Sequence, residues 1–421
     1  MSLEHVVEAL RIGGTIDPAL LDGWAADQAA KAEKVALYRD YVAGDHPQEL
    51  TDAMRRMMRV RADSPMQEFC LNYMDIVVQT LADRLRVAAI DANDEAARDW
   101  AADRMAANGF DGLQGDVHEA ALTDGDTFVL AYFDPAARRV RWSHESAFDG
   151  ENGMLVWYDG ANDSQPSAAL KTWRVGEAVR VTVYYADRVE RYISGHGGLA
   201  AYDTDDQPAV AAWTKSGDSA LSLPIGVPVV HFRNRARRWG SAFGAHGTSE
   251  IETAIPIQNA LNRTLYSMVM AAELSAFQIR YAVGWQPPAD LAPGMWVTIS
   301  PDRPLDRDER IEIGTLAQGE LMPYLDMARY LAAEIGRITR TPSPEFGWEM
   351  ASGESLKQRE TGLIGKARRF QVKAGEAWSR LFSLTARIEG AFLPQTGGGS
   401  RGDLTQAVFR PQWASVDVRS E

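Results

Sequence analysis

Four acidic side chains near the middle of the sequence are of the type that performs acid–base or nucleophilic chemistry. A pair of carboxylates can hydrolyse or transfer a glycosyl group when one acts as the acid and the other as the base or nucleophile. No two of these acids fall into a recognised catalytic spacing. A hydrolase or transferase with a carboxylate-based site on residues 125–232 therefore stays an alternative. The acids are Asp124, Asp126, Asp134 and Glu145, and the neighbouring Trp142, Trp157 and Trp173 would suit a sugar-binding cleft.

Signatures of other catalytic and metal-binding sites are incomplete. Residues 362–367 approach a phosphate-binding loop, but the spacing is wrong and no hydroxyl follows Lys366. His118 and His144 are each followed by glutamate, yet neither has the second histidine one turn later that a zinc protease requires. The acidic stretch 203–206 lacks the glycine and the distal glutamate of a calcium loop. We therefore expect no cofactor, no bound metal and no enzymatic activity.

Two basic clusters are candidates for contact with a neighbouring subunit or with DNA. Basic side chains in an acidic chain can bind phosphates or pair with acids of another subunit. A solvated surface is the third interpretation, and the sequence leaves all three open. The first cluster is Arg233, Arg235, Arg237 and Arg238, and the second is Lys357, Arg359, Lys366, Arg368, Arg369 and Lys373.

The net charge of −14 argues against a protein that grips nucleic acid, because such binding needs Lys and Arg to neutralise phosphates. It does not exclude a DNA conduit, since a channel through which DNA slides should not hold phosphates tightly. The same charge would also keep any protein soluble. Charge alone therefore does not decide between these interpretations.

Length and composition set further bounds. The 421 residues are enough for two or three domains. No window approaches eighteen unbroken apolar residues and the N-terminus lacks a signal-peptide pattern, so we expect no membrane contact and a cytoplasmic product. The single cysteine, Cys70, excludes a disulfide framework, and its apolar neighbours favour a packing role.

The first half of the chain has helical and strand-like patterns in separate blocks. Such segregation predicts an α+β fold with a mostly antiparallel sheet. The predicted helices are 3–11, 20–42, 48–58, 66–84, 95–107 and 113–123. The predicted strands are 127–133, 139–143, 154–158, 169–174, 179–185, 189–193, 209–215 and 224–232.

The stretch 247–392 is the part around which the rest is organised. A helix is predicted from Ser249, which forms a capping box with Glu252, and Pro256 predicts a kink in it. A second helix is predicted over 320–340, where prolines stop it. The intervening residues are rich in Pro and Gly and contain two short predicted strands, 295–300 and 310–313. We therefore expect two helices side by side as the stalk of a small lobe.

A very long third helix is predicted over 352–391, with Ser352 as its cap and bends at its internal glycines. Its apolar residues lie on more than one face, so it must be covered on several sides. Neighbouring subunits of a ring would supply that cover, and so would a larger core within one chain.

Several short stretches, in order, resemble the portal protein family of long-tailed bacteriophages. Residues 37–46 look like its "YY-x-G-x-H" opening, and residues 71–85 look like its "N-Y-x-x-x-I-V-D … R-L" helix. Trp100, Asn108 and residues 118–126 are similar to its helix leading into a strand. Residues 227–234, Gly244 and residues 249–251 resemble its approach to the stem, and residues 352–357 its "S-G-x-x-L-K" helix start.

The resemblance implies a portal-like division of the chain. Residues 1–246 would be the wing, 247–276 and 319–341 the two stem helices, and 277–318 a small α/β clip. Residues 342–351 would be a tunnel loop, in which Glu345, Phe346, Trp348 and Glu349 face DNA, or else an ordinary connection with its aromatics packed inward. Residues 352–395 would be a long kinked helix, and 396–421 a linker and a C-terminal strand. The helical crown that is usual in the family is small or absent.

The resemblance also implies a function and partners. The chain would form a homo-dodecameric ring at one vertex of the capsid, around a channel through which double-stranded DNA passes in packaging and ejection. The large terminase subunit and head-completion adaptor proteins would dock on the clip, and the major capsid and scaffolding proteins would contact the ring. Assembly would occur in the host cytoplasm and the product would be part of the virion. A different head–tail connector ring is a further alternative, although it would not need a stalk and a lobe.

Overall fold

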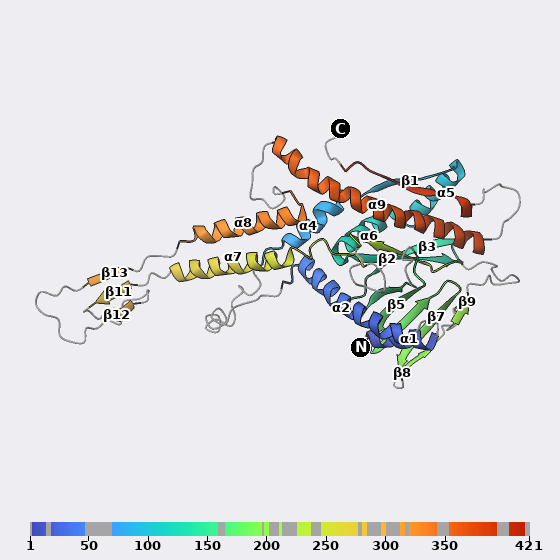
Figure 1. Ribbon diagram of the computed structural model, residues 1–421, viewed down its shortest axis with the longest axis horizontal. Coiled ribbons are helices and arrows are strands. Elements are labelled where there is room, and N and C mark those ends of the chain that lie inside the picture. Colours follow the sequence, from blue (N-terminus) through green and yellow to red (C-terminus); the bar gives the residue numbers. More distant parts are fainter. Residues whose placement is uncertain are drawn as a thin grey trace, which may run out of the picture.

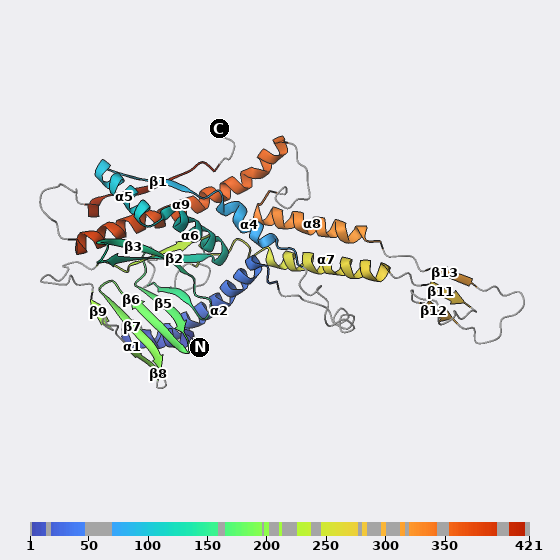
Figure 2. The ribbon, with the colours of Figure 1, turned by 180° about the vertical axis from the view of Figure 1, so that it is seen from behind.

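The computed structural model describes most of the chain, and it is elongated (Figure 1). The described residues are 2–13, 18–46, 70–158, 165–195, 198–201, 210–212, 225–236, 246–276, 280–283, 296–299, 312–315, 320–342, 353–393 and 404–416. Two helices, α7 (Ile255–Ala276) and α8 (Met322–Thr339), project side by side from a mixed body. A small sheet lies at their far end, so the predicted stalk and lobe are confirmed in outline (Figure 2).

The distal sheet has three short strands in the order β12-β11-β13. Strands β12 (Trp296–Ile299) and β13 (Glu312–Thr315) match the two predicted strands. The middle strand β11 (Arg280–Val283) was not predicted; it is parallel to β12 and antiparallel to β13. With only four residues, one of them Arg280, this segment is too short to show a clear strand period.

The body contains two main sheets, where the sequence predicted one. Strands β10-β2-β3 form the first, and β4-β5-β6-β7-β8 with β9 form the second, both antiparallel. The first sheet consists of β2 (Asp126–Asp134), β3 (Arg139–Ser146) and β10 (Val229–Arg233). The second consists of β4 (Gly153–Trp157), β5 (Ala168–Val175), β6 (Ala178–Tyr184), β7 (Arg188–Gly195), β8 (Gly198–Ala201) and β9 (Val210–Ala212).

The N-terminal helices cover these sheets. Helices α1 (Ser2–Gly13) and α2 (Pro18–Ala43) lie where they were predicted, and α1 packs on the second sheet. Helix α4 (Tyr73–Ala82) begins seven residues later than predicted, because the side chain of Asn72 accepts hydrogen bonds from the backbone N–H groups of Met74 and Asp75 and so caps it there. Helices α5 (Glu95–Ala107) and α6 (Phe110–Asp124) follow, and the predicted helix 48–58 lies outside the described residues.

The long helix α9 (Gly353–Phe392) lies against the first sheet and the C-terminal strand, and it carries much of the main core. Phe370, Trp378, Leu381, Phe382 and Ile388 are buried, which confirms burial on several sides. Gly375 lies against Pro411 and Trp413 of β14 (Phe409–Trp413), so its missing side chain admits a close strand. That strand pairs with β1 (Val87–Ala92), a two-stranded sheet that was not predicted, and the short 3-10 helix Leu404–Gln406 precedes it.

Two details of the stalk helices differ from the prediction. Helix α7 begins at Ile255, so Pro256 lies in its first turn, where a missing N–H costs nothing, and the predicted kink is wrong. Ser249 accepts from the N–H of Ile251 at 3.3 Å and not from that of Glu252, so the predicted capping box is wrong too. Helix α8 ends at Thr339 and is capped by Arg340, whose left-handed φ of 58° turns the chain so that the N–H of Thr341 also bonds the carbonyl of Gly336, at 2.9 Å. Among the described helices, none is long and apolar enough to cross a membrane.

Candidate functional site: the base of the stalk

The first turns of α7 are attached to the body by amide side chains. Tyr41, at the end of α2, donates its hydroxyl to Asn259 at 2.6 Å. Asn262 and His46 meet at 2.8 Å between Nδ2 and Nδ1, and the ring of His46 stacks on Tyr41 at 4.6 Å between centroids. Gln258 donates to the carbonyl of Leu71 at 2.7 Å. These bonds hold the stalk against the segment between α2 and α4.

A buried ammonium joins both stalk helices to α9. Lys366 forms an ion pair with Glu250 at 2.8 Å and donates to the carbonyl of Thr339, in the last turn of α8, at 2.6 Å. Both side chains are buried, and burial lowers the pKa of Lys366 while the Glu250 carboxylate opposes that change. Glu250 also accepts from Asn234 at 2.9 Å. One lysine therefore ties the end of α8 and the approach to α7 to the long helix.

The segment just before α7, which contains Gly247, passes the start of β2 at a point where only glycine fits. A Cβ atom on Gly247 would lie 1.7 Å from the carbonyl oxygen of Gly125, and one on Gly125 would lie 2.8 Å from the carbonyl carbon of Gly247. Gly125 also has a φ of 86°, which L side chains rarely adopt. The backbone that leads into the stalk is thus fixed against the start of β2.

A buried network of charged and polar groups surrounds this crossing. Asp126, fully buried at the start of β2, forms an ion pair with Lys31 of α2 and accepts from the N–H of Gly247 at 2.8 Å. His231 of β10 lies 2.8 Å from the same carboxylate and His246 lies 2.6 Å from Asp27. The network links α2, β2, β10 and the residues just before the stalk.

Protonation states in this network follow from burial. Burial lowers the pKa of Lys31 to about 7, and the carboxylates of Asp124 and Asp27 oppose that shift. Burial also lowers the pKa of His231 well below its ordinary value, so the ring is neutral. Its Nε2–H donates to Asp126, and its Nδ1 accepts from the hydroxyl of Tyr158 at 2.8 Å. The Tyr158–His231–Asp126 chain ends at a buried phenol, which fits a fixed structural chain better than a proton relay to a substrate.

A second buried histidine joins α6 to α9. His118 is 1% exposed and its pKa is lowered to about 4 because burial disfavours the charged ring. Its Nδ1–H donates to the carbonyl of Leu85 at 3.0 Å, and its Nε2 accepts from the indole of Trp378 at 3.0 Å. Both ring nitrogens of the neutral imidazole therefore have hydrogen-bond partners within the chain.

The four acids considered for catalysis are engaged in structure. Asp124 pairs with Arg39 at 2.7 Å, Glu145 with Lys171 at 2.7 Å, and Asp126 belongs to the buried network. Asp134 accepts from the N–H groups of its own turn. The tryptophans do not form a cleft with them, because Trp142 and Trp157 are buried in different clusters and Trp173 lies under the ammonium of Lys171 at 5.6 Å. Among the described residues, no group of three potential ligands could hold a metal ion.

The predicted contact residues do not form one cluster. Arg235 approaches Glu250 at 3.7 Å and Arg233 lies over the ring of Tyr158 at 5.7 Å. Lys366 is buried within the chain, so we assign it to the base of the stalk and no longer to a surface contact. Arg368, Arg369 and Lys373 are exposed on α9, and Lys357 and Arg359 lie in its first turns. Arg237, Arg238, Glu345, Phe346, Trp348 and Glu349 lie outside the described residues.

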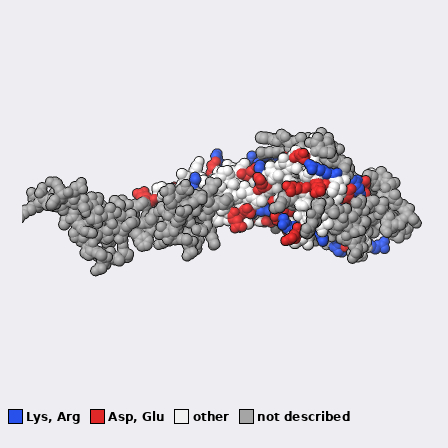
Figure 3. Space-filling model, turned by 90° about the horizontal axis from the view of Figure 1, so that it is seen from below, with Lys and Arg blue, Asp and Glu red and all other residues white. Residues whose placement is uncertain are grey.

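The described surface carries both signs of charge side by side. In the view of Figure 3, acidic and basic side chains are interspersed over the described part of the body and form no continuous basic tract there. Several of these charges are paired within one helix, such as Arg337 with Glu334 and Lys373 with Glu376. This pattern favours a surface that does not hold DNA phosphates tightly.

An apolar stripe on α8 is the most exposed apolar feature of the stalk. Met322, Met327 and Tyr330 are more than half exposed, and Leu321 and Tyr324 are each 36% exposed. Exposed large apolar side chains that gather along one helix mark an interaction surface. Sequence reasoning missed this stripe, because its residues have the same spacing as those of a core-facing helix.

Comparisons with known proteins were made with the sequence and with the fold. The family profile described as "Phage portal protein, SPP1 Gp6-like" matches residues 26–397. No curated protein matches the sequence significantly. Among solved structures, a chain of the "Neck of empty GTA particle computed with C6 symmetry" is similar, with a TM-score of 0.41, 12% identity, and coverage of 87% of this chain and 86% of that one.

Proposed function

Because the chain belongs to the phage portal protein family, a structural family of the virion, we propose that it forms a dodecameric ring at one capsid vertex. The ring is the channel for genome packaging and ejection. The observation that carries this proposal is the pair of projecting stalk helices with an exposed apolar stripe on α8. In a ring, each stripe is covered by the stalk of the next subunit, through a heterologous interface that closes.

In this proposal each region of the chain corresponds to a part of a portal protein. Residues 1–246 are the wing, 247–276 and 319–341 the stem, and 277–318 the clip. The stalk α7–α8 and the distal three-stranded sheet support these boundaries. Residues 342–351 are the tunnel loop, and residues 352–395, which contain α9, return the chain to the wing. Residues 396–421 are the linker and the terminal strand.

The clip is the docking site in this proposal. The distal sheet lies at the far end of the stalk from the body, where a motor or an adaptor can reach it without contacting the capsid (Figure 2). We assign terminase and head-completion proteins to this end, and capsid and scaffolding proteins to the body. Tunnel-loop residues Glu345, Phe346, Trp348 and Glu349 are assigned to the DNA side, and the exposed cations of α9 to subunit or DNA contact.

The test is the mass and shape of the purified protein. Light scattering and negative-stain microscopy should show rings of about twelve copies with a central hole. The double substitution Met327→Glu and Tyr330→Glu should shift the population to monomers, because it places charge in the apolar contact. Val175→Glu, at an apolar residue that is 48% exposed on the body, is the matched control and should leave rings intact.

A monomer that persists at high concentration and in the presence of capsid and scaffolding partners would contradict the ring. A ring that forms equally well with and without the stalk substitutions would contradict the role of the α8 stripe, because the subunit contact would then lie elsewhere.

A further inference from the structure

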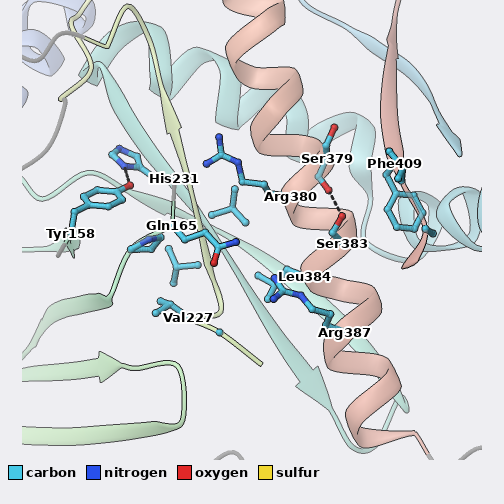
Figure 4. Close-up of a pocket in the computed structure, with 16 residues that line it drawn as sticks. Tyr158, Gln165, Val227, His231, Ser379, Arg380, Ser383, Leu384, Arg387 and Phe409 are labelled. Carbon is cyan, nitrogen blue, oxygen red and sulfur yellow. Dashed lines mark hydrogen bonds between the residues drawn. The ribbon is translucent and has the colours of Figure 1, made fainter. Parts of the chain in front are cut away.

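A pocket of about 410 Å³ lies between β10 and α9 (Figure 4). Val227 and Val229 line it from the β10 side, and Leu384 and Arg387 line it from α9. Its size falls within the range of sites that take a small ligand or a few side chains of a peptide. It shares Tyr158 and His231 with the buried network at the base of the stalk, and its other lining residues lie outside that network.

Two arginines of α9 lie on the same wall of this pocket. Arg380 and Arg387 are seven residues apart, two turns along the helix, and both project toward the space between α9 and β10 (Figure 4). Arg380 approaches Glu376 at 3.6 Å. Arg387 has no hydrogen bond or ion pair with any residue that the structure describes, and its Nη1 lies 3.7 Å from the position that a Cβ on Gly226 would take.

The surroundings of Arg387 leave its charge uncompensated. The guanidinium is partly buried, and burial lowers the pKa of Arg387 with no carboxylate to oppose the shift. The hydroxyls of Ser379 and Ser383, also in the pocket, donate to helix carbonyls and contribute no negative charge. A partly desolvated cation of this kind gains from an anion that enters the pocket.

The rest of the lining is mainly apolar, with Tyr158, Gln165 and His231 as its other polar residues. Leu384 and Phe409 are buried, while Val408 is 53% exposed at the edge of the pocket. A ligand that fills this site needs an apolar group beside its negative charge. Duplex DNA fits poorly, because DNA binding uses a row of cations along an open surface and this pocket offers two.

We propose that the pocket between β10 and α9 binds an acidic peptide segment of a partner protein. An apolar side chain of the peptide lies against Leu384 and Val408, and an adjacent carboxylate binds Arg387 in a bidentate pair. The chain has a net charge of −14 and repels acidic peptides as a whole. At this site the local geometry around Arg387 favours an acidic peptide despite that repulsion. The proposal does not depend on how many copies form the assembly.

The test uses fluorescence anisotropy of a labelled hexapeptide of alternating glutamate and leucine, with the full-length protein. Wild type should bind it saturably, and Arg387→Gln should weaken binding by at least about tenfold, which corresponds to the loss of one hydrogen bond to a charged group. Arg387→Lys should keep part of the affinity because it keeps the charge. Arg98→Gln, at an exposed arginine of α5 outside both basic clusters, is the control and should bind like wild type.

A second peptide, in which glutamine replaces glutamate, should bind at least about tenfold more weakly. Circular dichroism of each variant shows that the fold is intact. The proposal is overturned if wild type does not bind the acidic peptide, if Arg387→Gln binds it as well as wild type, or if the neutral peptide binds equally. It is also overturned if a short duplex DNA displaces the peptide at lower concentration than unlabelled peptide does, because the site would then favour phosphates.

Discussion

Replacing Lys366 by methionine should loosen the base of the stalk while leaving the rest of the body folded. Methionine keeps the apolar stem of the side chain and removes the ammonium. Among the described residues, the buried Glu250 carboxylate would then keep only Arg235 as a cation, 3.7 Å away and 36% exposed, and the carbonyl of Thr339 would lose its donor. Breaking a buried ion pair from one side costs about 3–5 kcal/mol, and the remaining Arg235 places the expected cost at the lower end of that range.

The appropriate assay is hydrogen exchange, because the effect is local. Reporters are the N–H groups of Thr341, Thr248 and Glu250, which bond within or beside the affected contacts. Since about 1.4 kcal/mol corresponds to a factor of ten, these amides should exchange on the order of a hundredfold faster or more. Amides of β5 and β6 should be unchanged. The control Arg369→Gln alters an exposed side chain on the same helix.

A double variant separates the ion pair from simple loss of packing. Lys366→Met with Glu250→Gln removes the unpaired charge and keeps an acceptor for Asn234. It should exchange more slowly than Lys366→Met alone, since replacing both partners costs less than removing one. Exchange in Lys366→Met equal to that in the control, or strictly additive effects in the double variant, would refute the role assigned to this ammonium.

Two further predictions concern buried groups. His118→Gln should reduce acid sensitivity. The folded pKa of His118 is lowered from 6.5 to about 4, so its contribution to stability is full above pH 6.5 and is lost as the pH falls toward 4. The free energies of unfolding from urea titrations at pH 7 and pH 5 should therefore differ by about 2 kcal/mol less than in wild type. An unchanged pH dependence would contradict this, because the Trp378 indole would then tolerate a protonated ring. Gly247→Ala should prevent correct folding because of the collision with Gly125, whereas Gly365→Ala, with open space around its Cβ on α9, should stabilise by up to about 1 kcal/mol in thermal melts. Equal melting temperatures for these two variants would refute the close crossing.

Local patterns in the sequence predicted most helices and strands of the body, because each has a clear period. The stalk helices and α9 were predicted within a few residues, apart from the start of α7. The start of α4 was missed although its signal, the Asn72 cap, is local. The strand β1 was missed because it pairs across more than three hundred residues with β14, which lies in the predicted C-terminal strand.

The candidate site was only partly predictable, for the same reason. Lys366 looked like one of several surface cations, and nothing nearby in sequence reveals that Glu250 and Thr339 close around it. Several residues that carry the family resemblance, however, meet at the base of the stalk. Tyr41 and His46 contact α7, and Asn234 bonds the carbonyl of Thr248 and the side chain of Glu250. Weak motifs that are far apart in the sequence therefore attach the stalk to the body.

That convergence bears on how the stalk would act in a ring. Thr339 lies just before the proposed tunnel loop, and Lys366 holds its carbonyl from the helix that follows the loop. The residues before α7 are fixed to β2 by the glycine crossing and to α2 through Asp126 and Lys31. A displacement of the stalk would therefore have to break buried charge contacts or carry α9 and α2 with it. Since breaking such contacts costs several kcal/mol, we expect the stalk and the loop-bearing end of α9 to move together with the body as one rigid unit.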